Sequence, residues 1–378
     1  MIGPRVFTIA WKELIQLRRD RLTAAMMVGL PVMQLLLFGW AINTDVRHMP
    51  TVVFDQDQSA QSRDLVRAME ATGYYDIAGH VRSYEEIQRA MRNGSARVAL
   101  VVPARYGSDV TRGSAVQLQL VVDGSDPQTV ASATNTAASL VAARSGELLV
   151  GRIGKSGAAG GASVAALSLE PTTWYNPDLR TAVYIVPGLI GVILTMTMVL
   201  LTAMAVARER ERGTLELLIV SPVNRVEIVL GKIVPYVVIG YVQMTLVLVF
   251  GRWVFDVPLV GSLPLLYLLS FLFIAANLAL GLFFSTLAKT QQQAMQMSFF
   301  FMLPNILLSG FMFPFEGMPE PAQWLSQALP LTHFLRIVRG ITLKGASFDD
   351  VAPELVWLGG ILLALVVLSS VRFRKKLG

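Results

Sequence analysis

Cysteine is absent from this 378-residue chain, and charged residues make up only 15% of it. The first absence excludes disulfides and every metal site or nucleophile that depends on a thiolate. The second lies well below the roughly 25% of charged residues in an average soluble domain, while hydrophobic residues reach 53%. A chain of this composition buries apolar surface against lipid as well as in a core, so the composition predicts a membrane protein.

Sequence patterns of catalysis and of metal binding are also missing. Histidine occurs at His48, His80 and His333, and these positions lack the spacing of metal ligands. We therefore expect each histidine at the protein surface or at the membrane interface. Carboxylates paired for acid–base work, a Ser-His-Asp set and an HExxH motif are not recognised. The sequence predicts no catalytic, cofactor-binding or metal-binding residue, and the chain is not expected to be an enzyme.

Long apolar runs are abundant, and a membrane-spanning helix needs about 20 such residues. Six stretches qualify or nearly qualify: residues 22–42, 182–207, 229–250, 263–287, 294–313 and 353–371. Prolines inside them are tolerable, because neighbouring helices can satisfy the freed carbonyl groups. Charged residues are almost absent near the centres of these stretches, which disfavours a carrier driven by an ion gradient. The predicted fold class is an α-helical polytopic membrane protein with six transmembrane helices.

The distribution of Lys and Arg predicts the orientation of these spans. Basic residues gather before the first stretch, after the second and in the C-terminal tail, and fewer lie on the other side. The positive-inside rule then places both termini in the cytoplasm and residues 43–180 outside it. On this assignment Arg336, Arg339 and Lys344 lie in a short exterior loop. The first apolar run is longer than the core of a signal peptide, which favours an uncleaved anchor over a cleaved leader.

The exterior segment, residues 43–180, alternates strand-like and helix-like patterns and is predicted to be an inserted α/β or α+β extracytoplasmic domain. Expected strands cover 51–54, 97–102 and 115–122, and expected helices cover 59–72, 83–91 and 129–150. The second helix begins with a capping box, because Ser83 stands three residues before Glu86. Residues 151–166 are rich in Gly and Ala and are predicted to be a flexible link.

A predicted cytoplasmic loop, residues 208–232, joins the second and third spans, and its first five residues alternate arginine and glutamate. Leu215, Leu218 and Ile219 then share one helical face. Ser221-Pro222 ends the turn. A short helix of this kind suits docking into a groove on a cytoplasmic partner. The alternative is a solvated loop whose basic residues only set the topology, and for a generic membrane protein this alternative is favoured.

The N-terminal segment, residues 1–21, is amphipathic in a helical projection. Basic and polar residues fall on one face, and apolar residues fall on the other. This pattern is typical of a helix that lies in the membrane interface. A basic leader that only sets topology is an alternative of equal weight.

Methionines recur within the predicted spans and are suited to an adaptable apolar path. They are Met196, Met198, Met204, Met295, Met297 and Met302. The alternative, which is more common, is that such side chains face lipid or neighbouring helices.

Five groups of residues carry a family resemblance in their order along the chain. They are Trp11-Lys12-Glu13; Arg19-Asp20-Arg21 with Pro31; Val53–Asp57 with Ser59–Ser62; Glu209–Glu216 with Ser221-Pro222 and Gly231-Lys232; and Phe313–Pro319. Together they resemble the ABC-2 type exporter permeases, in particular a drug-efflux-like subgroup with a large periplasmic domain between spans one and two. The resemblance covers essentially the whole chain and rests on order and topology rather than on one decisive motif.

This resemblance implies a permease of the bacterial inner membrane that dimerises, with itself or with a related permease, on two cytoplasmic ABC ATPase subunits. ATP and Mg would be bound by that ATPase and not by this chain. The loop after span two would supply a coupling helix made of Arg208, Glu209, Arg210, Glu211, Arg212, Gly213, Thr214, Leu215, Glu216, Leu218, Ile219, Ser221 and Pro222. The N-terminal interfacial helix would also contact the ATPase, through Trp11, Lys12, Glu13, Arg19 and Asp20.

The segment after the fifth predicted span is too polar and broken to continue that helix. The resemblance implies a re-entrant helix pair near the exit path on the outer side. Its residues would include Phe313, Pro314, Phe315, Glu316, Met318 and Pro319. The alternative is an ordinary exterior loop in the interfacial aromatic belt.

The implied substrate is hydrophobic or amphiphilic, such as a drug or a lipid-like molecule, because the path lacks charged selectivity groups. Membrane lipids and a periplasmic adaptor protein are further expected partners, and nucleic acid is not. The alternative function is a non-transporting membrane scaffold that recruits envelope partners through its periplasmic domain.

Overall fold

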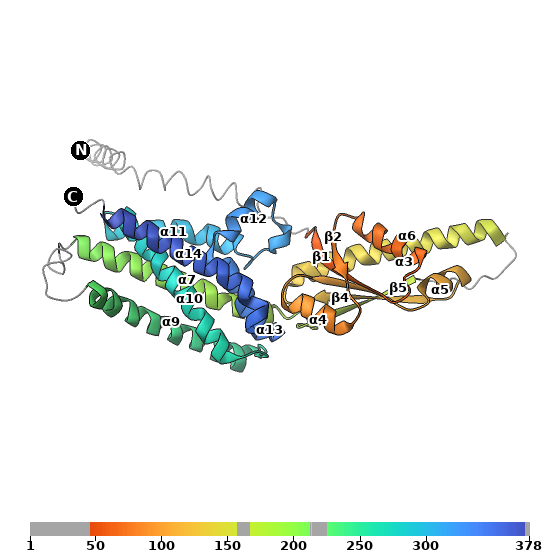
Figure 1. Cartoon of the computed structure of the whole chain (residues 1–378), viewed down its shortest axis with the longest axis horizontal. Helices are drawn as coiled ribbons and strands as arrows, with labels where there is room; N and C mark the ends of the chain where they lie inside the picture. The colour runs from red at the N-terminus through yellow and green to blue at the C-terminus, as the bar shows by residue number, and fades with distance from the viewer. Residues whose placement is uncertain (1–45, 157–166, 212, 214–224, 375–378) are drawn as a thin grey trace, which may run out of the picture.

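The computed structural model describes residues 46–156, 167–211, 213 and 225–374. Within them a β-sheet part and a helix bundle lie end to end along the longest axis (Figure 1). The predicted interfacial helix (1–21), the predicted first span (22–42) and most of the predicted coupling helix lie outside the described residues.

The sheet part contains a five-stranded mixed sheet with the order β2-β1-β3-β4-β5. Its strands are β1 (Met49–Asp55), β2 (Tyr75–His80), β3 (Val98–Val102), β4 (Val116–Asp123) and β5 (Leu167–Trp174). β1 is parallel to both β2 and β3, β4 is antiparallel to β3, and β5 is parallel to β4. The three strands expected from the sequence are the three central ones.

Helices cover both faces of this sheet, because alternate strand residues point to opposite sides. The helices are α3 (Ala60–Glu70), α4 (Tyr84–Arg92), α5 (Tyr106–Arg112) and α6 (Pro127–Ser156). Leu118 and Leu120 of β4 share a buried cluster with α3, α5 and α6. Val121 of the same strand joins a second cluster with Ile87 and Met91 of α4. The sheet is therefore the middle layer of three.

Two local features of the sheet part can be compared with their predictions from the sequence. The Ser83 hydroxyl accepts a hydrogen bond from the Glu86 amide (3.2 Å), as the capping box predicts, while the Glu86 carboxylate accepts from the Arg82 amide (2.7 Å). The flexible link expected from residue 151 is wrong for its first six residues, because α6 continues to Ser156. Extending an existing helix costs only about 1 kcal/mol for a glycine relative to alanine.

Among the described residues, the bundle contains five long helices and a broken segment between the last two of them. The long helices are α7 (Thr181–Glu211), α9 (Arg225–Phe255), α10 (Leu263–Leu287), α11 (Gln291–Leu308) and α14 (Phe348–Arg374). The broken segment consists of η2 (Phe315–Gly317), α12 (Glu320–Gln327) and α13 (Pro330–Lys344). The bundle core forms where α7, α10 and α13 meet, and Phe273 stacks there on Phe334 at 4.0 Å between ring centroids.

Four helices of the described residues, α7, α9, α10 and α14, are long and apolar enough to cross a membrane. They contain the predicted stretches 182–207, 229–250, 263–287 and 353–371. The predicted fifth stretch, 294–313, has the wrong boundaries, since α11 begins at Gln291 and ends at Leu308. The helix ends there because Ser309 is its C-terminal cap and Gly310 adopts a φ of 84°, which an α-helix cannot continue.

Candidate functional site

The last turn of α7 holds the connection between α10 and α11, residues 288–290. Arg210 Nη1 donates hydrogen bonds to the carbonyl oxygens of Ser285 (3.3 Å) and Ala288 (2.9 Å). These carbonyls lie at the C-terminal end of α10, where backbone acceptors lack helical partners and a cation is stabilised by the helix dipole. Arg210 therefore acts as a side-chain cap on α10.

Gln291, the first residue of α11, is bound to the same turn by three hydrogen bonds. Arg208 Nε donates to Gln291 Oε1 (3.1 Å), while the Gln291 amide and its Nε2 donate to the two oxygens of the Glu211 carboxylate (2.9 and 2.5 Å). The carboxylate thus lies at the N-terminus of α11, where the helix dipole favours negative charge. We call Arg208, Glu211 and Gln291 the α7–α11 clamp.

The clamp lies at the base of the predicted coupling helix. Of the predicted coupling residues, Arg208, Glu209, Arg210, Glu211 and Gly213 are described, and Gly213, two residues after the end of α7, has a φ of 67°. The others lie outside the described residues, as do all five of the predicted interfacial helix: Arg212, Thr214, Leu215, Glu216, Leu218, Ile219, Ser221, Pro222, Trp11, Lys12, Glu13, Arg19 and Asp20.

Gln291 was not among the predicted site residues, although a signal for it exists. Thr290 and Gln293 have the spacing of a capping box, and the Thr290 hydroxyl accepts from the Gln293 amide at 3.1 Å. Gln293 Oε1 in turn accepts from the Lys289 amide at 2.9 Å. The pattern marks Gln291 as the start of a helix, but its contact with α7 requires the tertiary structure.

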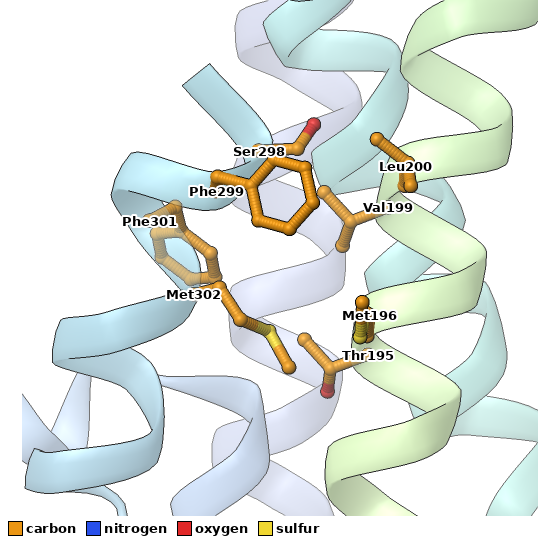
Figure 2. Close-up of a pocket in the computed structure, with 8 residues that line it drawn as sticks. All are labelled: Thr195, Met196, Val199, Leu200, Ser298, Phe299, Phe301 and Met302. Atoms are coloured by element: carbon orange, nitrogen blue, oxygen red, sulfur yellow. The ribbon is translucent and has the colours of Figure 1, made fainter. Parts of the chain in front are cut away.

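A small apolar crevice of about 10 Å³ lies between α7 and α11 nearer the middle of the bundle (Figure 2). Its lining residues are Thr195, Met196, Val199 and Leu200 from α7, and Ser298, Phe299, Phe301 and Met302 from α11. Met196 and Phe299 remain 44% and 50% exposed. Apart from two hydroxyls, the lining offers only apolar and thioether groups to a ligand.

Two of the six methionines of the predicted path, Met196 and Met302, line this crevice. Met198 is instead fully buried in the bundle core, and Met297 packs beside a cluster of α7, α10 and α11. Met196 and Met198 lie on different faces of α7, because residues two apart in a helix do not share a face.

At the opposite end of the bundle, Arg339 of α13 closes the break after α11. Its Nη1 donates to the Gly310 carbonyl (2.9 Å), and its guanidinium stacks on the ring of Tyr184 at 4.1 Å. The Tyr184 hydroxyl donates to the Phe311 carbonyl (2.8 Å). Together α7 and α13 satisfy carbonyls that the interrupted helix leaves without helical partners.

Four buried or partly buried charged side chains connect the sheet part to the bundle. Arg97, at the start of β3, contacts Asp123 through Nη1 (3.0 Å) and Glu316 of η2 through Nε (2.9 Å). Lys344, at the end of α13, forms an ion pair with Asp123 and donates to the Met91 carbonyl (3.1 Å). We call Arg97, Asp123, Glu316 and Lys344 the sheet–bundle ion network.

Electrostatics within this network favour the charged forms of the acids and of the arginine. Burial by itself raises the pKa of Asp123, but Lys344 and Arg97 outweigh it and hold that pKa at about 2. Burial likewise disfavours the ionised form of Glu316, whereas Arg97 favours it. The pKa of Glu316 is lowered overall. Glu316 raises the pKa of Arg97. Burial lowers the pKa of Lys344, and the Asp123 carboxylate opposes that effect.

Three basic residues and one histidine of the connection between α11 and α14 lie in the helix α13. Arg336, Arg339 and Lys344 are thus helical, and their predicted exterior side stays a prediction. His333 of the same helix is fully buried, with its ring nitrogens 2.5 Å from Glu354 Oε2 and 2.9 Å from the Gln327 carbonyl, so its predicted surface position is wrong. The reason is that α13 is a helix with apolar residues at helical spacing, which pack into the bundle core.

The predicted re-entrant residues gather where the sheet part contacts the bundle. Glu316 belongs to the ion network, and Phe315 lies under the Arg336 guanidinium at 4.7 Å. Met318 is buried in a small cluster against which Phe313 packs. Pro314 and Pro319 are the residues that precede η2 and α12. Two short helices, α12 and α13, follow this segment, and the re-entrance of residues 313–319 into the membrane stays a prediction.

A polar cavity of about 510 Å³ lies between the same elements and the sheet part. Its walls include Arg97, Asp126, Glu316, Arg339 and Glu354. In the part of the chain that the structure describes, no group of three or more His, Cys, Asp or Glu side chains is arranged to hold a metal ion.

The long apolar helices of the described residues are those of a polytopic membrane protein. The family model described as "ABC-2 family transporter protein" matches residues 21–371. The chain therefore belongs to the ABC-2 family of transporter proteins and is an ABC-2 type permease.

Three relatives from Escherichia coli (strain K12) show how far the similarity extends. "Probable multidrug ABC transporter permease YbhR" is 33% identical over 347 residues, 92% of this chain and 92% of its own length. "Probable multidrug ABC transporter permease YbhS" is 29% identical and covers 90% and 89% of the two chains. "Inner membrane transport permease YhhJ" is 28% identical over 99% of this chain and 98% of its own.

Proposed function

We propose that this permease is the membrane subunit of an ATP-driven exporter that moves a hydrophobic or amphiphilic molecule, such as a drug or a lipid-like compound. The observation that carries the proposal is the clamp at the base of residues 214–224. The charged last turn of α7 binds α10 and α11 of its own chain, so a force applied to the adjoining loop reaches two further helices. Two relatives are named as probable multidrug permeases, which supports the substrate class.

The orientation that suits this role places the clamp in the cytoplasm and the sheet part in the periplasm. Both termini then lie in the cytoplasm, and residues 22–42 supply the first of six inner-membrane spans. The excess of Lys and Arg on the clamp side supports this orientation. The name of the relative YhhJ supports the inner membrane as the location.

The proposed partners follow from what the chain would need to work. A separate ABC ATPase would bind ATP and Mg and dock on residues 208–222, so that the permease itself needs no enzymatic activity. A second permease, identical or related, would complete the translocation path beside the α7–α11 crevice, whose apolar lining suits the proposed substrate. A periplasmic adaptor would contact the sheet part.

The coupling helix can be tested with the double variant Glu211→Ala/Leu215→Ala. We expect the permease to lose its stimulation of the partner ATPase, because both the clamp carboxylate and the proposed docking face are removed. The measurement is the ATPase rate of the reconstituted complex, with circular dichroism as a check that the spans remain folded. The matched control is Glu70→Ala/Val150→Ala, which removes an exposed acid and an exposed apolar side chain from the sheet part.

The alternative, a non-transporting scaffold, gives the opposite result. A scaffold would recruit envelope proteins through the sheet part whatever the state of the loop. Undiminished ATPase stimulation by the loop variant would therefore contradict the exporter proposal.

A further inference from the structure

The α7–α11 clamp connects the base of the loop to the helix that forms one wall of the crevice. Gln291 is the first residue of α11, and Ser298 and Met302 of that helix line the crevice. At 1.5 Å per residue these wall positions lie roughly 10 to 16 Å along the helix from Gln291. A displacement of this helix end is therefore carried directly to the wall.

Between the clamp and the crevice, small residues bring α7 and α11 close together. Ala203 and Ala207 of α7 and Ala294 of α11 are fully buried in one cluster with Val199 and Phe284. Small side chains allow helix backbones to approach closely in a membrane. The two helices are thus joined at their ends and packed over the next turns, and the crevice lies beyond this packed region.

The clamp lies at an exposed surface, and its hydrogen bonds use a charged acceptor. The Glu211 carboxylate accepts both an amide and a side-chain hydrogen bond from Gln291. Bonds to a charged acceptor are about twice as strong as neutral ones. The negative charge at the N-terminus of α11 adds a favourable dipole interaction.

We propose that Gln291 is a positioning residue through which α11 follows the last turn of α7, so that the clamp sets the width of the crevice during the ATP cycle. This inference rests on the proposed function, because it requires an ATPase that displaces the loop. Gln291 does not contact substrate. Its role is to make the two walls of the crevice respond together to the loop.

The test exchanges the donor and acceptor groups of the clamp. Gln291→Glu removes the Nε2 donor and sets two carboxylates against each other, which weakens the clamp, whereas Glu211→Gln/Gln291→Glu restores one amide and one carboxylate in reversed order. Gln292→Glu is the matched control, since the neighbouring side chain is exposed. Because the chain has no cysteine, Met196→Cys and Met302→Cys can be added to each variant as a unique pair across the crevice.

The readout is the yield of a short bifunctional maleimide crosslink in the reconstituted permease–ATPase complex, with and without ATP and vanadate. We expect the yield to change by about fivefold or more with nucleotide when the clamp is intact, a usual size for coupling between sites. Gln291→Glu should abolish this change while the ATPase still co-purifies. The reversed pair and Gln292→Glu should both retain it.

The possible outcomes distinguish failure of the proposed role of Gln291 from failure of the exporter proposal. A full nucleotide response in Gln291→Glu, or no recovery in the reversed pair, would overturn the role of Gln291 and leave the exporter proposal standing. If the crosslink yield of the cysteine pair does not change with nucleotide when the natural clamp is present, both the role of Gln291 and the exporter proposal are overturned. Loss of the response in Gln292→Glu would show a general effect of charge at this helix end and would also overturn the role of Gln291.

Discussion

At the scale of single residues, the charges between the sheet part and the bundle matter most. Asp123 and Lys344 are 1% and 5% exposed at their side chains. Removing one partner of a buried ion pair is strongly destabilising, because the other charge remains buried without compensation. Asp123 faces both Lys344 and Arg97, so its loss removes the carboxylate that pairs with the buried Lys344 and one of the two that pair with Arg97.

Asp123→Ala is therefore expected to lower the free energy of unfolding by about 3–5 kcal/mol. The native pKa of about 2 lies below the ordinary value of 3.8, so the carboxylate stabilises the fold above that ordinary value and loses its contribution as the pH falls towards 2. The measurement is thermal unfolding of the purified permease between pH 5 and pH 2. Natural protein should lose stability over this window more steeply than the variant.

The control for this prediction is Asp64→Ala. Asp64 pairs with Arg67 on an exposed surface of α3, with side chains 60% and 71% exposed, where an ion pair contributes little. Equal thermal stability of Asp123→Ala and Asp64→Ala would contradict the importance of the ion network.

At the scale of helices and strands, glycines allow neighbouring helices of the bundle to approach closely. A Cβ atom on Gly281 of α10 would lie 2.7 Å from the Val199 carbonyl oxygen of α7. Backbone cannot move aside as a side chain can, so α10 and α7 are in contact because position 281 has no side chain. Gly191 of α7 has a similar relation to Leu331 of α13, where the added Cβ would lie 2.5 Å from a methyl carbon.

Gly281→Ala should reduce stability by about 1–3 kcal/mol, the usual cost of overpacking a core. Gly359→Ala is the control, since an added Cβ on that glycine of α14 would meet nothing within 4 Å. Thermal unfolding of the two variants in the same detergent compares them directly. A lower stability of Gly359→Ala than of Gly281→Ala would show that the α7–α10 contact is not tight.

At the scale of the whole molecule, the two ends of the bundle have different partners. One end carries the clamp, and the other contacts the sheet part through the ion network (Figure 1). Along the sides, α9 and α14 expose apolar residues such as Val242, Leu246 and Val367. This surface suits lipid or a second permease, and burying it in a membrane would leave the two polar ends on opposite sides.

Opposite ends should be labelled from opposite sides of the inner membrane. Ser95→Cys in the sheet part and Lys289→Cys beside the clamp are both exposed positions in a chain without natural cysteine. In intact cells a membrane-impermeant maleimide should label Ser95→Cys, and Lys289→Cys should react only after the membrane is disrupted. Labelling of Lys289→Cys in intact cells would reverse the proposed orientation.

The elements predicted from the sequence are those with strong local periodicity. β3 and β4 were predicted because they are buried and rich in branched apolar residues. β2 and β5 were missed because they are edge strands: β2 contains Gly79, and β5 contains Pro171. Edge strands bury less surface and tolerate glycine and proline, so their pattern is weak.

The candidate site was predicted in part for the same reason. The alternating charges that begin at Arg208 are visible in the sequence, but their partner Gln291 lies 80 residues beyond Glu211. Similarly, Asp123 and Lys344 are 221 residues apart, and the sequence places Lys344 only in the connection between two spans. Periodicity reports what a segment buries and not which distant residue it meets.

The sequence by itself determined that this is a membrane protein, because its apolar residues are too many and its charged residues too few for a soluble protein. It also determined four of the spans, since each is long enough and apolar enough to be recognised without its neighbours. Only the tertiary structure decided that the charges of α7 hold α11, and that those of the sheet part hold α13. Hydrogen bonds and ion pairs act over a few ångströms, so they depend on which helices the fold brings together.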